Sequence, residues 1–133
     1  MDSFKGVLSA DIEAFGKTIV DCAFKVHTKL GPGLLENLYE SCLAYELQKS
    51  GLNVQRQLVV PVKYDELHIE QGLRLDLIVN DIVIIEIKAV EQVLEVHKAQ
   101  LLTYLKLTGK PLGYLINFNV KLIRDGIKRM VLS

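Results

Sequence analysis

The chain has 133 residues, half of them hydrophobic, which is enough for one domain whose core needs neither disulfides nor a structural metal. Sixteen basic residues balance sixteen acidic ones, which excludes the global positive charge of a strongly basic nucleic-acid-binding protein. No segment is apolar for long enough to cross a membrane, and the first fifteen residues lack the apolar run of a signal peptide. Cys22 and Cys42 match no metal-binding or redox spacing, so we expect free thiols and a cytoplasmic protein.

Two helices are expected at the start of the chain. Apolar residues recur at helical spacing from Ser9 to Leu30, and Ser9 is a suitable N-cap. The Gly-Pro-Gly sequence at residues 31–33 should end this helix. A second helix is predicted from Leu34 to Ser50, closed by Gly51.

The pattern changes to strands from residue 54. Residues 54–64 are rich in branched side chains, and Pro61 predicts an edge strand or a bulge. The segments 72–79 and 82–89 should form a hairpin around Asn80 and Asp81, which tolerate turn geometry. Both segments carry apolar residues on both faces, which predicts a sheet covered by helices on both sides.

The last third of the chain predicts one helix and two closing strands. We expect the helix from Glu91 to Thr108, and the strands at residues 112–118 and 127–132. One stripe of this helix should carry Val93, Val96, Gln100, Tyr104 and Leu107. Residues 1–133 are therefore predicted to form a single α/β domain with the element order ααβββαββ.

Glu86 and Lys88 are unusual because they interrupt an otherwise apolar strand, where an unpartnered charge is costly. Asp76 lies in the preceding strand, ten positions earlier. A two-residue loop at Asn80 and Asp81 would place Asp76 and Glu86 on opposite faces of the sheet. A three-residue loop, or one bulge, would pair them directly.

In the paired register, Asp76, Glu86 and Lys88 form a cluster of two oxygen donors and one ammonium group. Two carboxylates so close repel unless a proton or a cation lies between them. Mg²⁺, or Mn²⁺, suits oxygen ligands and keeps waters that can become nucleophiles, while the ammonium could stabilise charge on a phosphate. The alternative is an ion pair between Glu86 and Lys88 on a half-exposed strand. The apolar flanking strands favour the metal site.

These residues resemble the Asp…(Asp/Glu)-x-Lys signature of the PD-(D/E)XK nuclease superfamily, with Leu75 in place of the nominal proline. The sequence "GLLENLYESCL" resembles the Gly-x-x-Glu-x-x-Tyr motif of the GxxExxY protein family, at Gly33, Glu36 and Tyr39. The later "QLLTY" is similar to the Gln-x-x-x-Tyr motif of RecB-like nucleases. The resemblance covers roughly Ala23–Phe118, most of the chain.

The resemblance implies a restriction-endonuclease-like αβββαβ core, with a central mixed sheet flanked by helices. It implies a metal held by Asp76, Glu86 and the carbonyl of Ile87, with Lys88 as the catalytic lysine and Glu36 reaching in from its helix. Without the resemblance, Glu36 would be read as an acid that stabilises the N-terminus of a helix.

Four residues are candidates for substrate binding: Gln100, Tyr104, Tyr39 and His27. Gln100 and Tyr104 lie one helical turn apart, so their polar ends could reach a phosphate or a base. A partly buried helix face with satisfied hydrogen bonds would explain these two residues equally well. His27 could line the site near the Gly-Pro-Gly corner, although a lone histidine on a helix is more often structural.

The leading hypothesis is a Mg²⁺-dependent nuclease that hydrolyses phosphodiester bonds, with DNA as the preferred nucleic acid and no membrane partner. The alternative is a non-catalytic nucleic-acid-binding or assembly module that retains the nuclease fold. An exposed last strand could mediate a homodimer. Basic residues of the last third of the chain favour a phosphate-bearing substrate, unless they only solvate the surface. They are Lys98, Lys106, Lys110, Lys121, Arg124, Lys128 and Arg129.

Overall fold

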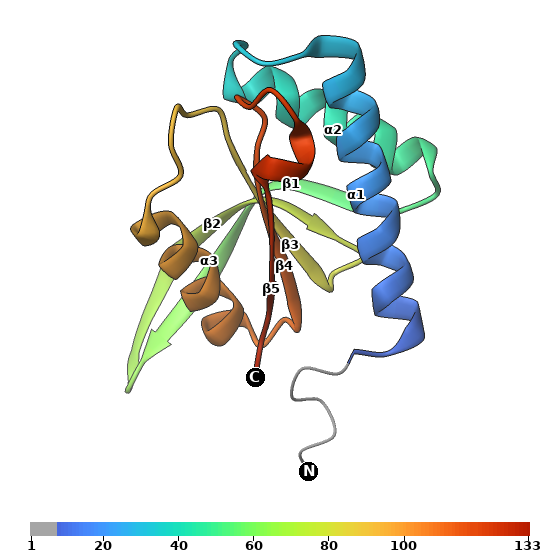
Figure 1. Ribbon diagram of the computed structural model, residues 1–133. Coiled ribbons are helices and arrows are strands. Elements are labelled where there is room, and N and C mark those ends of the chain that lie inside the picture. The colour runs from blue at the N-terminus through green and yellow to red at the C-terminus, as the bar shows by residue number, and fades with distance from the viewer. Residues whose placement is uncertain (1–7) are drawn as a thin grey trace.

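A five-stranded mixed sheet lies at the centre of the computed structural model, which describes residues 8–133. The strands lie in the order β1-β2-β3-β4-β5, and all neighbours are antiparallel except β3 and β4. Helices α1 and α2 cover one face of the sheet and α3 covers the other (Figure 1). The elements are α1 (Ala10–Leu30), α2 (Glu36–Lys49), β1 (Val54–Tyr64), β2 (Leu67–Val79), β3 (Val83–Lys88), α3 (Glu95–Thr108), β4 (Leu112–Asn117), the 3₁₀ helix η1 (Ile123–Gly126) and β5 (Ile127–Val131).

The predicted fold class and element order are confirmed, and the two N-terminal helices differ from the prediction only at their ends. Ser9 caps α1, because its hydroxyl accepts the N–H of Ile12 at 3.2 Å. Helix α2 begins at Glu36 rather than Leu34, because Leu35 has an extended backbone with φ −77° and ψ 149°. The expectation about a signal peptide concerns a segment whose residues 1–7 lie outside the described part.

The hairpin of β1 and β2 is longer than predicted. Strand β2 begins at Leu67 instead of residue 72, because its exposed first residues continue the pairing with β1, where Leu67 lies opposite Tyr64. The hairpin tip projects past the rest of the sheet (Figure 1). The predicted edge position and bulge of β1 are confirmed, with the bulge between Val60 and Val62.

Helix α3 begins at Glu95, four residues later than expected, and packs through a different stripe. Its buried residues are Leu101 and Leu105, whereas Val96 and Leu107 are 65% and 53% exposed. The predicted stripe was therefore wrong for Val96 and Leu107. Apolar residues occur around the whole helix, so spacing alone does not select the face that meets the sheet.

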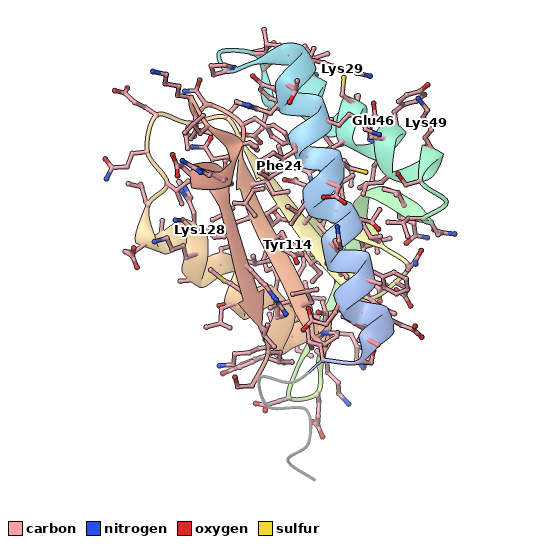
Figure 2. The ribbon with its side chains drawn as sticks, turned by 45° about the vertical axis from the view of Figure 1, so that its right-hand side comes forward. Phe24, Lys29, Glu46, Lys49, Tyr114 and Lys128 are labelled. Atoms are coloured by element: carbon pink, nitrogen blue, oxygen red, sulfur yellow. The ribbon has the colours of Figure 1, made fainter. Side chains whose placement is uncertain are left out.

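Helices α1 and α2 are held against the sheet and against each other by close packing and a buried charge. A Cβ atom at Gly16 would lie 2.5 Å from the hydroxyl of Tyr114, so glycine lets α1 approach β4 closely (Figure 2). Glu46 of α2 is 4% exposed and lies 3.8 Å from Lys25 and 3.5 Å from Lys29 of α1. Between residues 8 and 133, no helix combines the length and apolar character needed to cross a membrane.

The loop between β2 and β3 has three residues. Val79 pairs with Val83, so residues 80–82 form the loop. The first two of these, an Asn and an Asp, have φ values of 52° and 56°, which these residue types tolerate better than most. This register places Asp76 opposite Glu86 and confirms the prediction of an odd-length loop.

Deleting Asp81 should destabilise the protein by several kcal/mol, roughly 3 or more, in urea unfolding. The deletion leaves a two-residue loop, which shifts β3 by one position and moves Val83 and Ile85 out of the core under α1 and α2. The control Asp81→Asn keeps the loop length and loses only an exposed ion pair with Lys110, worth at most about 1 kcal/mol. Wild-type stability in the deletion variant would show that the loop does not set the register.

Candidate active site

Asp76 and Glu86 face each other where β2 and β3 stop pairing. Leu77 and Ile85 are the last paired residues on this side. Beyond them, the N–H of Asp76 donates to Oε2 of Glu86 at 3.0 Å, and the N–H of Ile87 donates to Oδ2 of Asp76 at 2.8 Å. Each carboxylate thus replaces part of the strand ladder, and the two acids are brought together.

The pKa values of both carboxyl groups are raised. Burial first, and then the negative charge of Asp76, raise the pKa of Glu86 to about 8. Burial is also the main cause of the raised pKa of Asp76, and the charge of Glu40 adds to it. The Lys88 ammonium lowers both pKa values without reversing either shift. A proton or a cation between the carboxylates is therefore favoured.

Gln57 of β1 lies opposite Asp76, at a point where the regular alternation of side chains between the two faces of the sheet is broken. Leu77 packs under α1 and α2 but Leu75 packs under α3, although residues two apart share one face of a regular strand. Gln57 has φ 51°, a left-handed conformation that costs a non-glycine residue on the order of 1–3 kcal/mol. The irregularity of both strands coincides with the position of Asp76.

The side chain of Gln57 connects Asp76 to helix α2. Its Nε2 donates to Oε1 of Glu40 at 2.6 Å and to Oδ1 of Asp76 at 3.5 Å. Glu40 is 7% exposed, and its other oxygen accepts from Nε of Arg56 at 3.0 Å. The sequence analysis missed Gln57 and Glu40. Only the register of the β1–β2 hairpin, set by its turn and by the bulge at Pro61, could have indicated Gln57.

Lys88 and Glu36 flank the carboxylate pair in different ways. Lys88 is half-buried, and its carbonyl accepts the N–H of Phe118 at 3.0 Å, which holds the end of β3 against the segment after β4. Glu36 is exposed at the start of α2, and its charge contributes to the raised pKa of Glu86. Electrostatic effects reach farther than metal bonds. Within residues 8–133, no three His, Cys, Asp or Glu side chains form a group that could hold a metal. Contrary to the expectation, Glu36 therefore does not join Asp76 and Glu86 in a cluster of three acids.

Tyr39 is fully buried and holds the corner between α1 and α2. Its hydroxyl donates to the carbonyl of Gly31 at 2.6 Å and accepts the N–H of Leu34 at 3.1 Å. Its ring stacks on Phe118 with centroids 4.6 Å apart. Substrate binding by Tyr39 stays a prediction that would require the ring to become exposed.

His27 also has a partner in the fold. Its Nε2–H donates to the carbonyl of Val120 at 2.8 Å, which ties α1 to the segment after β4. This contact agrees with a structural role. Substrate binding by His27 stays a prediction.

Tyr104 is influenced by the charges of Asp76 and Glu86. The pKa of its partly buried phenol is raised by burial and then by the charges of Glu86 and Asp76, while Arg74 lowers it. The phenol therefore lies within electrostatic reach of both acids and stays protonated at neutral pH. Gln100 is exposed one helical turn earlier. Arg74 is a nearby cation that the sequence analysis did not single out.

The sequence was compared with models of known protein families. A family model described as the PD-(D/E)XK nuclease superfamily matches residues 13–130. The chain belongs to the PD-(D/E)XK nuclease superfamily. Nucleases of this superfamily generally depend on a divalent metal. The helix-flanked mixed sheet agrees with the superfamily fold. The comparisons found no significant match among curated proteins or among solved structures.

The stability of the metal-free protein should fall as the pH rises from about 4.5 to about 8. In this range the unfolded chain has released the Glu86 proton, whereas the folded protein retains it, so folding opposes ionisation. Glu86→Gln keeps the shape and cannot ionise, so above pH 8 it should be more stable than wild type, by at most about 5 kcal/mol.

Thermal unfolding in chelator between pH 5 and pH 9 measures this effect. Glu66→Gln, at the exposed hairpin tip, is the matched control and should follow the wild-type curve. If the melting temperatures of Glu86→Gln and wild type changed in parallel with pH, the prediction that Glu86 has a raised pKa in the folded protein would be wrong.

Proposed function

We propose that this protein is a divalent-metal-dependent nuclease that hydrolyses phosphodiester bonds of nucleic acid, with Mg²⁺ or Mn²⁺ as its cofactor. The observation that carries the proposal is the direct opposition of Asp76 and Glu86 beside Lys88. Like charges are rarely buried together without a function, because each raises the cost of ionising the other. Membership of a nuclease superfamily supports the same conclusion.

Asp76, Glu86 and the carbonyl of Ile87 are the groups that would hold the cation. The bridging hydrogen bonds use one oxygen of each carboxylate, and a carboxylate has about four acceptor positions. The N–H of Ile87 points to Asp76, and the carbonyl of the same residue in an extended strand points to the same side. This donor set of hard oxygens suits Mg²⁺ or Mn²⁺. A bound cation would supply a more acidic water and positive charge near the phosphate.

The neighbouring side chains have separate roles in this proposal. Glu86 releases its proton when the cation binds, because both occupy the same negative site. Lys88 follows on the same face of β3, where its ammonium orients the attacking water or stabilises charge that develops on the phosphate. Tyr104 remains a neutral phenol that donates a hydrogen bond to a phosphate oxygen. Gln100, exposed on the same helix, contacts the nucleic acid farther from the reacting bond.

Assignment to the GxxExxY family is the finer part of the proposal. The structure offers a reason for two residues of that motif. Gly33 has φ 96°, which glycine adopts without strain, and Tyr39 closes the corner through its hydroxyl group. Glu36 acts through its charge at the rim of the site rather than as a ligand.

DNA is the substrate that we propose first. Three of the basic residues considered above already form ion pairs: Lys98 with Glu95, Lys110 with Asp81 and Arg129 with Glu13. A neutral protein with few remaining cations should bind nucleic acid weakly and with a steep salt dependence. A cytoplasmic location, and a homodimer formed through the edge strand β5, remain part of the proposal.

Two substitutions should separate the metal site from the chemistry. Glu86→Ala removes a metal ligand, so metal binding and cleavage should be lost together. Lys88→Met removes no ligand, so it should keep the metal and lose cleavage by about 100-fold or more. Metal titration calorimetry and cleavage of linear, nicked, single-stranded and branched DNA and RNA measure both effects.

Glu66→Ala is the control for both variants and should behave as wild type. Equal loss of metal by Glu86→Ala and Lys88→Met would indicate a structural ion pair. Nucleic-acid binding without cleavage by the wild-type protein in Mg²⁺ and in Mn²⁺ would favour the non-catalytic module.

Metal binding should release about one proton per cation at pH 7, and affinity should increase as the pH approaches 8. The reason is the raised pKa of Glu86, which leaves that group mostly protonated before the cation arrives. Calorimetry in buffers with different ionisation enthalpies counts the protons. A count near zero at pH 7 would place the cation away from Glu86.

A further inference from the structure

Gln57 is a neutral side chain that contacts two carboxylates, Asp76 and Glu40. Its Nε2 carries two hydrogens, and the two acceptors are Oε1 of Glu40 at 2.6 Å and Oδ1 of Asp76 at 3.5 Å. Because both partners are carboxylates, only the nitrogen of the amide can serve them. The exposed side chain therefore lies between helix α2 and strand β2, with a short contact to Glu40 and a long contact to Asp76.

Glu40 does not need Gln57 for charge compensation. Arg56 contacts its Oε2 at 3.0 Å and provides the positive charge. Glu40 is thus a buried anchor with a fixed position, from which an amide can reach toward Asp76. The contact chain runs from Arg56 through Glu40 and Gln57 to Asp76.

The neutrality of Gln57 matters for a cation site. A lysine or arginine in its place would also donate to Asp76, but its positive charge would compete with a metal ion. An amide holds the oxygen and leaves the negative charge of the carboxylate available. Oδ2 of Asp76 is held independently by the N–H of Ile87 at 2.8 Å, so each oxygen has its own donor.

The backbone of Gln57 is also unusual. Its φ of 51° belongs to the left-handed region, which glycine adopts far more readily than glutamine. A position chosen for stability alone would favour glycine here. The chain instead has a long side chain whose amide reaches the carboxylate opposite.

We infer that Gln57 is a positioning residue that orients Asp76 for the cation through the buried anchor Glu40. The inference rests on the proposed metal-dependent function, because its consequence is the affinity for the metal. It assigns to β1, an edge strand outside the superfamily motif of Asp76 and Glu86–Lys88, a role in the geometry of the site.

Gln57→Gly tests the inference, because it removes the amide and relieves the left-handed backbone. We expect a melting temperature within about 4 °C of wild type, or above it. The dissociation constants for Mg²⁺ and Mn²⁺, measured by calorimetry, should rise by about 10- to 100-fold. Asp65→Gly is the matched control: Asp65 has φ 52° at the distant hairpin tip, and its substitution should change neither metal constant.

A second variant, Gln57→Lys, tests the need for a neutral donor. It keeps a donor of similar length beside Asp76 and should weaken metal binding at least as much as Gln57→Gly. Wild-type metal affinity in Gln57→Lys would contradict the argument from neutrality and overturn the inference.

Four further outcomes separate the inference from the proposed function. Unchanged metal affinity in Gln57→Gly, with a wild-type protein that binds metal and cleaves, overturns the inference alone. A loss of affinity that only parallels a loss of melting temperature also overturns it, since Gln57 would then be structural. Absence of metal binding by the wild-type protein overturns both, whereas metal binding without cleavage overturns only the nuclease function.

Discussion

The pairing of Asp76 with Glu86 across the ends of β2 and β3 is the constraint on which the site depends. Burial, and then the negative charge of Asp76, destabilise the ionised form of Glu86 and raise its pKa to about 8. The fold tolerates this because each acid accepts one backbone N–H that the interrupted strand ladder leaves available. Without a cation, the neutral form of Glu86 is favoured at pH 7. This arrangement reduces stability at neutral pH, and in the proposed function a bound cation would offset that cost.

The surrounding scaffold holds the end of β3 rigidly. Strand β3 is buried on both faces, between α1 and α2 on one side and α3 on the other. Its parallel neighbour β4 pairs Lys88 with Asn117, and the buried amide of Asn117 accepts the N–H of Val90 at 3.1 Å and donates to its carbonyl at 2.9 Å. The chain on either side of Lys88 is thus held by backbone and side-chain hydrogen bonds. Such fixed supports are what a catalytic geometry requires.

Three glutamates of α2 show how environment determines the role of one residue type. Glu36 is exposed at the start of the helix and acts through its charge. Glu40 is buried, paired with Arg56, and anchors the amide that reaches Asp76. Glu46 is buried on the side facing α1, between two lysines, and joins the helices. The role of each glutamate therefore depends on its exposure and on the residues that it contacts.

The sequence by itself determined the order of the elements and the cap of α1. It also indicated an edge strand or a bulge near Pro61 and predicted Asp76, Glu86 and Lys88 as site residues, because each of these depends on local pattern or residue type. It left two registers open for β2 and β3, since apolar side chains on both faces of β3 provide no alternation that would select one. Tertiary structure selected the three-residue loop and the buried face of α3, where Leu101 and Leu105 meet the sheet. It also decided that Gln57 meets Asp76, because contacts between distant segments depend on the register and bulges of whole strands rather than on neighbouring residues.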